Sequence, residues 1–504
     1  MRKFKRIITF IIMIVMTISL VSCENNNLNS MDYEGRTFYE IFVRAFNDSN
    51  GDGIGDIKGV TQKLDYLQEL GIKGIWLMPV TKSTSYHGYD TEDYYLIDED
   101  YGDIDDLKEL IDEAHKRDIK VIMDLVLNHT STEHPWFKEA SQDKNSQYRD
   151  YYIWTEDMSK IDEISNMDTK RWAKNGDKNE LYNAIFWEGM PDLNMDNPKV
   201  IQETKDIAKY YLELGIDGFR LDAVKWIYED KEKNIAFWQQ FHDYVKSVNE
   251  NAVLVGEVWD KPAAITDYAE PLDSFFEFEI GKVIMDGIQN RLIASIPEKF
   301  NSWNDNYLSK NENFVISNFL SNHDQSRVMN RLRETDKAKM AAAIYLTLPG
   351  TPYIYYGEEI GMRGSKPDEK IREPFIWSST DKSLNTSWIE ITNDISSVAL
   401  DIQKDDEDSI YNFYKDIIKI KNENEALKYG KVNAIDVGNR AVLVMERTYN
   451  KDRALVIINS SSKEENITLD KKGYKVLYSN GNNKGIEKLS SEVSLKSGEV
   501  IIVK

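Results

Sequence analysis

The chain has very little of three things: cysteine, basic charge and long apolar runs. One cysteine in 504 residues cannot form an intramolecular disulfide, and the sequence has no Cys-x-x-Cys pair to hold zinc or to exchange thiols. Acidic residues outnumber basic ones by 86 to 63, giving a formal net charge of −23. Such a chain repels phosphate backbones, and no Lys/Arg run outside the N-terminus offers a local exception, so a nucleic-acid partner is excluded.

The remaining composition is that of a globular protein. Hydrophobic residues make up 41% and charged residues 30% of the chain, which is enough for one large core and one or two smaller ones. Without disulfides, the stability of these cores must come from packing.

The N-terminus carries a predicted export signal. Four basic residues fall within the first six, and Ile7 to Val21 form an apolar run of 15, short of the ~20 residues that span a bilayer as a helix. We therefore predict a signal peptide over residues 1–22. Leu20-Val21-Ser22-Cys23 resembles the bacterial lipoprotein box, which implies lipidation of Cys23 and an extracytoplasmic protein anchored to the bacterial cell membrane only through that lipid. An ordinary signal peptide with a chance cysteine is the alternative, and the Asn-rich residues 23–32 are expected to form a flexible tether.

The pattern that follows alternates between short apolar strands and segments of helical periodicity. Eight strands separated mostly by helices predict parallel pairing, and this count favours closure into a (β/α)₈ TIM barrel over an open doubly wound sheet. The expected strands are Thr37–Phe46, Gly74–Val80, Lys120–Leu127, Gly218–Asp222, Ala252–Val258, Phe275–Ile280, Phe314–Phe319 and Thr351–Tyr356.

Two segments depart from this alternation. A polar, aromatic stretch after the third strand predicts a small inserted domain over residues 131–190, which divides the barrel into residues 33–130 and 191–427. Residues 428–504 contain short strands punctuated by Asn, Gly and Ser, which predict a C-terminal antiparallel β-sandwich.

Carboxylates stand at the ends of several predicted barrel strands, where parallel barrels gather their reactive groups. Arg220 and Asp222 lie two residues apart on one strand, so they project to the same side, and the guanidinium is expected to keep this carboxylate ionised. Glu257 lies between apolar and aromatic residues, a setting that raises a carboxyl pKa. One ionised and one protonated carboxyl are what retaining glycoside cleavage requires, and Asp324 could stabilise positive charge on the sugar. Taken alone, each such residue is more often a helix cap or an ion-pair partner.

Together these segments resemble the α-amylase family of glycoside hydrolases (family 13), from about Phe38 to the end of the barrel. The four motifs that carry the resemblance, in order, are Asp124-Leu125-Val126-Leu127-Asn128-His129, Gly218-Phe219-Arg220-Leu221-Asp222, Gly256-Glu257-Val258-Trp259 and Ser321-Asn322-His323-Asp324. The resemblance implies that Asp222 is the nucleophile, Glu257 the general acid/base and Asp324 the transition-state carboxylate.

The resemblance also implies a set of residues that contact sugar. Tyr89 is expected to stack on the sugar ring and Lys225 to meet sugars on the leaving side, although Trp226 follows it where amylases usually have histidine. The other implied contacts are His87, Asp90, His129, Arg220 and His323. For His87, Tyr89 and Asp90 the alternative is a hydrogen-bonded loop cluster.

Three functions remain open at this point. The first is an endo-acting α-amylase that cuts internal α-1,4 bonds of starch and maltooligosaccharides. The second is an oligo-1,6-glucosidase, α-glucosidase or neopullulanase-like hydrolase, because Met190-Pro191-Asp192-Leu193-Asn194 lies between the forms typical of those enzymes. The third is a non-catalytic starch-binding surface lipoprotein. The sequence does not determine an oligomeric state, and a monomer is favoured.

A metal site is predicted in the loop after the first strand. Asp48, Asn50, Asp52 and Asp56 occupy positions 1, 3, 5 and 9 of a calcium-type loop, with the backbone carbonyl of Ile54 at position 7. Position 12 is glycine and not the bidentate glutamate, so the loop is not a complete EF-hand. We expect structural calcium here, and the alternative is a turn that caps the next helix. A second calcium at Asn128 is left open.

Overall fold

The computed structural model describes residues 33–504, and its centre is a closed barrel of eight parallel strands. Each strand pairs with its neighbours in chain order, and the last pairs with the first through Phe38 and Tyr353. The predicted barrel is therefore confirmed, and the open sheet is excluded. The barrel strands are β1 (Phe38–Ile41), β2 (Gly74–Leu77), β5 (Lys120–Leu125), β9 (Gly218–Leu221), β10 (Val253–Gly256), β11 (Ser274–Phe276), β12 (Val315–Asn318) and β13 (Thr351–Tyr355).

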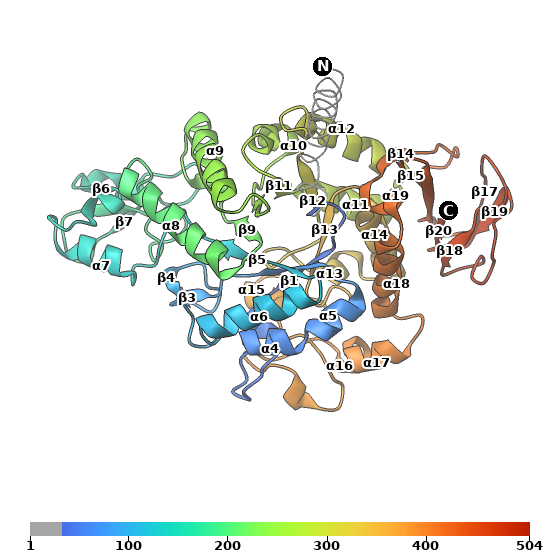
Figure 1. Cartoon of the computed structure of the whole chain (residues 1–504), viewed down its shortest axis with the longest axis horizontal. Coiled ribbons are helices and arrows are strands. Elements are labelled where there is room, and N and C mark those ends of the chain that lie inside the picture. The colour runs from blue at the N-terminus through green and yellow to red at the C-terminus, as the bar shows by residue number, and fades with distance from the viewer. Residues whose placement is uncertain (1–32) are drawn as a thin grey trace, which may run out of the picture.

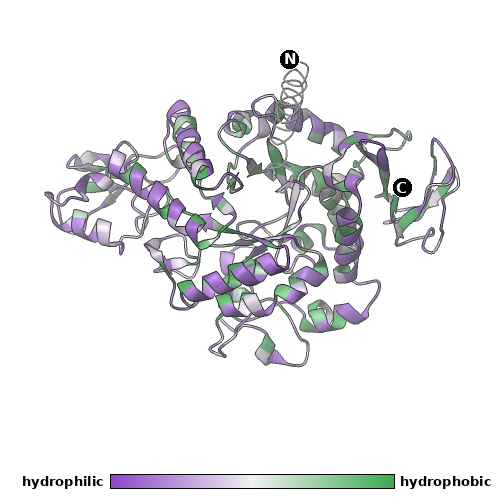
Figure 2. Ribbon diagram, in the orientation of Figure 1, coloured by the Kyte–Doolittle hydropathy of each residue, from purple (hydrophilic) through white to green (hydrophobic). Residues whose placement is uncertain are grey.

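Helices surround the barrel (Figure 1). In Figure 2 most of them carry both polar and apolar stretches, as expected for helices with one buried face. The longer helices are α4 (Ile57–Gln62), α5 (Leu64–Leu70), α6 (Ile104–Lys116), α7 (Pro135–Gln142), α8 (Pro198–Leu214), α9 (Lys231–Val248), α11 (Phe278–Asn290), α12 (Ile296–Leu308), α14 (Thr335–Thr347), α17 (Leu400–Asp405) and α18 (Ile410–Asn422). The shorter ones are α3 (Val43–Phe46), α10 (Pro262–Ile265), α13 (Val328–Leu332), α15 (Asp368–Ile371), α16 (Ile395–Val398) and α19 (Glu425–Tyr429).

Helix α8 shows how the sequence sets these elements. Asn197 caps its start by accepting from the backbone N–H of Lys199, and Pro198 occupies the first turn, where a missing N–H costs nothing. Gly215 ends the helix in the left-handed conformation, with φ of 107°. The start and end of α8 are therefore determined by residues next to the helix in the sequence.

Two predicted strands run on into helices. The first strand ends at Ile41, and Val43–Phe46 is helical. The sixth ends at Phe276, and Phe278 begins α11, so its predicted continuation to Ile280 is wrong. In each case an apolar run continues from a strand into a buried helical turn, which periodicity cannot separate over so few residues.

Two antiparallel sheets project from the barrel before β9. Strands β3 (Thr81–Ser83) and β4 (Thr91–Ile97) form a hairpin that the sequence analysis missed. Strands β6 (Trp154–Thr155), β7 (Trp172–Lys174) and β8 (Leu181–Asn183) form the sheet of the insertion, on the opposite side of the molecule from the C-terminal strands in Figure 1.

The C-terminal strands form the predicted antiparallel structure. A five-stranded sheet of order β14-β15-β16-β20-β18 is accompanied by the two-stranded sheet β17-β19. Side chains from both, including Val444 and Val493, share one buried cluster, as in a small sandwich. The strands are β14 (Lys431–Ala434), β15 (Val442–Tyr449), β16 (Asp452–Asn459), β17 (Glu465–Thr468), β18 (Val476–Ser479), β19 (Glu492–Leu495) and β20 (Val500–Val503).

The barrel interior is packed rather than hollow. A buried cluster that includes Trp76, Val255 and Tyr353 fills it. At the end where the strands begin, the hydroxyl of Tyr33 forms hydrogen bonds with Ser317 (2.8 Å) and Tyr353 (3.0 Å). These bonds tie Tyr33 to the interior of the barrel.

Some expectations lie outside what the structure addresses. The signal peptide, the tether and the lipidation site at Cys23 fall outside residues 33–504, and the domain boundaries stay predictions. Within residues 33–504, no helix combines the length and apolarity that crossing a bilayer requires.

Candidate active site

Arg220 organises the carboxyl end of the barrel. Its Nη1 lies 2.5 Å from Oδ1 of Asp124 and 2.6 Å from Oδ1 of Asp222, and its Nη2 lies 3.0 Å from Oε2 of Glu257. The guanidinium is 1% exposed. Three carboxylates thus share one buried cation, whereas the sequence analysis paired only Asp222 with Arg220.

Strand register brings these groups together. Asp124 on β5 is the direct partner of Arg220 on β9. One step past the strand ends, the backbone N–H of Glu257 donates to Leu221 O at 2.8 Å, which holds this glutamate beside Asp222. Ala223 adopts a left-handed conformation, φ 51°, and donates its N–H to Oε2 of Glu257 at 3.0 Å.

The two carboxyls beside Arg220 have perturbed acidities. The pKa of Asp222 is raised to about 6, because burial and the nearby Asp124 together outweigh the opposing effect of Arg220. Burial also raises the pKa of Glu257, with Arg220 opposing and Asp222 adding to the shift. The expectation for Glu257 agrees with this direction. For Asp222, Arg220 acts in the expected direction and a pKa of about 6 still leaves the carboxyl mostly ionised at neutral pH, but one guanidinium divided among three carboxylates does not fully offset desolvation.

Asp324 has the opposite environment. Its Oδ2 lies 3.0 Å from Nε2 of His323, and its Oδ1 lies 3.1 Å from Nη2 of Arg372. Burial opposes ionisation, but His323 and Arg372 hold the pKa of Asp324 well below its usual range. His323 also pairs with Glu40 on β1 at 2.6 Å, and although burial works against its charge, Asp324 and Glu40 raise its pKa to about 9.

A cavity of about 330 Å³ opens above these groups. It is lined by His87, Tyr89, His129, Phe186, Met190, Asp222, Ala223, Glu257, Asp324, Asp368 and Arg372. Six of the ten residues predicted for catalysis or sugar contact therefore share one cavity.

The other four predicted residues lie behind or beside this cavity. Arg220 and His323 are buried beneath it and reach it through the carboxylates that they bind. Asp90 is 1% exposed and accepts hydrogen bonds from Ser83 (2.7 Å), Thr84 and Ser85. This is the loop cluster that was the alternative for Asp90, and it fixes the hairpin from which His87 and Tyr89 enter the cavity.

Lys225 follows β9 and pairs with Asp260. The two atoms Nζ and Oδ2 lie 2.6 Å apart, and the ammonium lies 5.3 Å from the ring centroid of Trp226. Lys225 is thus held at the margin of the site, outside the cavity lining.

The family comparison agrees with this geometry. A family model described as "Alpha amylase, catalytic domain" matches residues 40–430. The chain belongs to the α-amylase family of glycoside hydrolases.

Similar proteins of this family cover nearly the whole chain. "Alpha-amylase 3" of Dictyoglomus thermophilum is 44% identical over 90% of both chains, and an "Oligo-1,6-glucosidase" of Bacillus cereus is 32% identical over 84% of this chain and 90% of its own. The crystal structure of the α-amylase from H. orenii superposes with a TM-score of 0.86 at 38% identity, covering 94% of this chain and 99% of that chain.

Several residues of the site were not found from sequence. Arg372 and Asp368 lie about a helical turn apart on and beside α15, well after the end of β13, so strand-end reasoning did not reach them. Glu40 had a usable signal, because it is a charged residue in the middle of an apolar strand. Phe186 comes from the insertion, whose sequence shows no clear period.

The predicted metal loop forms a chain of tight turns. Asp48 accepts from the backbone N–H groups of Gly51 and Gly53, both at 2.7 Å, and Asp52 accepts from that of Ile54 at 2.7 Å. Asn50 likewise accepts from the backbone of Asp52 at 2.8 Å. These side-chain oxygens are hard donors of the kind that calcium prefers. In this conformation they accept from the loop's own backbone, and within residues 33–504 no three acidic, histidine or cysteine side chains are grouped as they would be around an ion.

Asp56 also has the role that the alternative assigned to it. Its Oδ1 accepts from the backbone N–H of Gly59 at 2.6 Å and caps α4, while its Oδ2 accepts from Ser49. Elsewhere in residues 33–504, Asn128 donates to Asp192 at 3.0 Å, and burial raises the pKa of this aspartate to about 7.

Proposed function

We propose that the protein is a retaining, endo-acting α-amylase that hydrolyses internal α-1,4 bonds of starch and maltooligosaccharides. The observation that carries this proposal is the pair Asp222 and Glu257, both bound to the guanidinium of Arg220 at the floor of one cavity. The name of the 44% identical relative from Dictyoglomus supports the bond type.

The arrangement suits the first chemical step. Within residues 33–504, Oδ1 of Asp222 is engaged by Arg220 and Oδ2 makes no hydrogen bond, so Oδ2 is free to attack the anomeric carbon. Oε2 of Glu257 accepts from Ala223 and Arg220, which leaves Oε1 to carry the proton. As the carbon–oxygen bond to the leaving sugar breaks, Oε1 protonates the leaving oxygen and a glycosyl ester forms on Asp222.

The second step reverses these roles. Glu257, now ionised, takes a proton from water, the water oxygen bonds to the anomeric carbon, and the ester to Asp222 breaks with retention of configuration. Asp324 stays ionised next to His323 and Arg372 and stabilises the positive charge that develops on the ring in both steps.

The product profile tests the proposal. Purified protein should convert maltoheptaose into mixed short maltooligosaccharides of α configuration at early times and leave panose largely intact. Stepwise glucose release, or cleavage of the α-1,6 bond of panose, would instead establish the α-glucosidase or neopullulanase alternative, which the 32% identical oligo-1,6-glucosidase relative favours. Binding of starch without any hydrolysis would establish the non-catalytic alternative.

We also propose structural calcium in the loop Asp48–Asp56, with Asp48, Asn50, Asp52, the carbonyl of Ile54 and Asp56 as ligands. The type and spacing of the oxygen donors support this proposal, and the ion would draw them together in the loop between β1 and α4. Millimolar Ca²⁺ should then raise the melting temperature over that in EDTA. Asp52→Asn can still accept from the N–H of Ile54 but loses a charge, so it should reduce this rise, and an equal rise in the variant would refute the site.

A lipid anchor at Cys23 completes the proposal. The residues that support it are the basic start, the apolar run and Leu20-Val21-Ser22-Cys23. Metabolic labelling with a fatty-acid analogue should mark the unmodified protein and not Cys23→Ser. Equal labelling of both would refute the anchor.

A further inference from the structure

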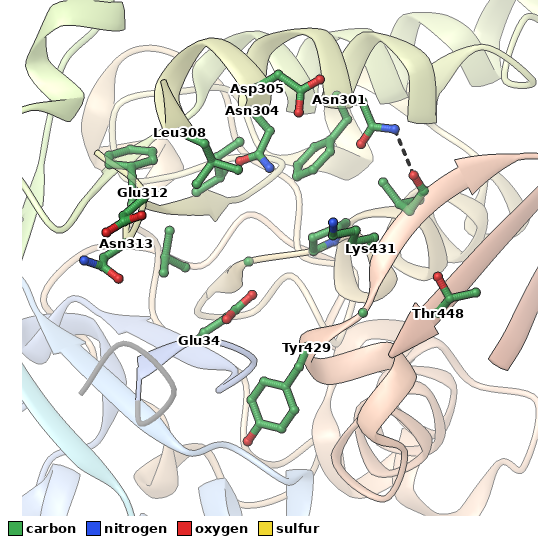
Figure 3. A pocket seen from close by; sticks show the side chains of 18 of the residues that line it. Glu34, Asn301, Asn304, Asp305, Leu308, Glu312, Asn313, Tyr429, Lys431 and Thr448 are labelled. Atoms are coloured by element: carbon green, nitrogen blue, oxygen red, sulfur yellow. Dashed lines mark hydrogen bonds between the residues drawn. The ribbon is translucent and has the colours of Figure 1, made fainter. Parts of the chain in front are cut away.

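A second cavity, of about 460 Å³, is larger than the catalytic one. It lies between α12, the start of β12 and the strand β14 of the C-terminal sheet (Figure 3). Glu34, which precedes β1, and Gly350, which precedes β13, also line it. The cavity is therefore at the end of the barrel where the strands begin, opposite the catalytic carboxylates.

The walls of this cavity are fixed by contacts across the seam between barrel and C-terminal sheet. Asn301 of α12 donates to Val432 O on β14 at 2.8 Å, a bond drawn in Figure 3. Buried Arg447 donates to Gly430 O at 2.7 Å and to Thr347 O. These bonds hold the two sides in place, so the cavity is formed before anything binds.

The lining combines hydrogen-bonding side chains with an apolar wall. Asn304, Asn313 and Asn433 line it and make no side-chain hydrogen bonds within residues 33–504. Figure 3 shows Asn304 and Leu308 pointing from α12 toward Glu34. The volume falls in the range of ~300–1,000 Å³ typical of small-molecule sites.

The charges limit what can bind. Glu34, Asp305 and Glu312 face one Lys431, so an anionic ligand is disfavoured. No group of three or more metal-ligating side chains occurs anywhere in residues 33–504, so these carboxylates do not form a chelating cluster. Free carboxamides and carboxylates beside apolar side chains suit a neutral ligand with hydroxyl groups on its rim and C–H groups on its face.

We propose that this cavity is a second binding site for α-glucan, separate from the site of cleavage. The proposal rests on the proposed function, because it takes the same polymer as ligand. An enzyme that holds a glucan chain at the end of the barrel opposite its active site stays on an insoluble substrate between cleavage events, so the second site should matter for granular starch and not for short soluble substrates.

The test separates binding from cleavage. In the Asp222→Asn background, Asn304→Trp fills the cavity and should weaken adsorption to starch granules by about tenfold in Kd, and Asn304→Ala should do so less strongly. With Asp222 intact, Asn304→Trp should hydrolyse maltoheptaose with unchanged kcat/KM. Asn306→Ala, on the same helix but outside the cavity lining, is the matched control and should leave adsorption unchanged.

Calorimetric titration with maltoheptaose supplies a second readout. The Asp222→Asn protein should bind at two sites and its Asn304→Trp form at one, while Glu34→Gln should keep both because the ligand is neutral. Unchanged adsorption and stoichiometry in both Asn304 variants would overturn the second site. Loss of binding in Glu34→Gln alone would overturn a glucan in favour of a cationic ligand. Failure of the unmodified protein to hydrolyse maltoheptaose would overturn the proposed function instead.

Discussion

Strand β9 carries an aspartate at each end, and the two have opposite surroundings. Asp217, just before the strand, lies 2.7 Å from His115 and 3.0 Å from Lys120, and it accepts from the N–H of Val121 at 2.8 Å. Burial opposes its ionisation, yet His115 and these donors lower its pKa. Asp222, just after the strand, shares Arg220 with two other carboxylates, and burial raises its pKa.

The same contrast holds for neighbouring strands. Before β11, Asp273 pairs with Lys246 at 2.9 Å and accepts from the N–H of Leu254, and before β5, Asp118 pairs with Arg36 and Lys73. Each of these aspartates has cations of its own. Carboxylates where these strands begin therefore fasten neighbouring strands, whereas Asp124, Asp222 and Glu257, where strands end, share a single guanidinium. Asp324 at the same end is the exception, because His323 and Arg372 both pair with it. Perturbed carboxyls that share a cation in this way cluster at functional sites, at a cost in stability.

Replacing the two aspartates of β9 in turn tests this contrast most strongly. Asp222→Asn should lower kcat on maltoheptaose by roughly 10⁴-fold or more, because the nucleophile is lost. The raised pKa of Asp222 means that its ionisation penalises the folded state as pH rises from 3.8 through about 6. The variant should therefore melt at a higher temperature than the unmodified protein at pH 7. Activity close to that of the unmodified protein would exclude the proposed mechanism.

Asp217→Asn should show the reverse pattern, with unchanged kcat and a free energy of unfolding lower by about 2 kcal/mol. The lowered pKa of Asp217 contributes stability above pH 3.8 that is lost as pH falls through its folded value, and the raised pKa of His115 contributes stability below pH 6.5 that is lost as pH rises through its folded value. The difference between the two proteins should be largest between these pH values in urea titrations. A large loss of kcat in a folded Asp217→Asn protein would show that the aspartate before β9 also affects catalysis, which would contradict the contrast between the two ends of the strand.

The sequence predicts which residues gather at the carboxyl end of the barrel better than it predicts their pKa values. Buried parallel strands read as apolar runs, so eight of them could be counted, and a polar residue at the end of such a run, as at Asp222 or Glu257, stands out. The ends of strands and helices were harder to predict, because the apolar run around Phe276 continues from strand into helix without a change of residue type.

The features of the site that could not be predicted from the sequence depend on contacts between distant segments. Arg220 is two residues from Asp222 in sequence, but its bonds to Asp124 and Glu257 arise only from strand register. Arg372 reaches Asp324 from a helix far along the chain. The pKa direction of Asp222 therefore required the structure.

Asp124 offers a finer test of the shared guanidinium. It touches Arg220 and raises the pKa of Asp222, so Asp124→Asn should leave Arg220 more fully to Asp222. The acidic limb of the pH profile of kcat/KM, which reports ionisation of the nucleophile, should move to lower pH by about one unit. Asp118→Asn, just before the same strand, is the matched control and should leave the limb in place. An unmoved limb in Asp124→Asn would mean that the three carboxylates do not compete for Arg220.

The smallest expected effect is at the hydroxyl of Tyr33. Tyr33→Phe removes its hydrogen bonds to Ser317 and Tyr353 but keeps the ring, and Ser317 retains its bond to Ser274 at 2.6 Å. The free energy of unfolding should fall by about 1 kcal/mol, measured by urea titration, while kcat and the pH profile stay unchanged. Because the packed barrel interior separates Tyr33 from the carboxylates, a shift in the pH profile of this variant would show that the hydrogen bonds at one end set the electrostatics of the other, and the two ends could no longer be treated as independent.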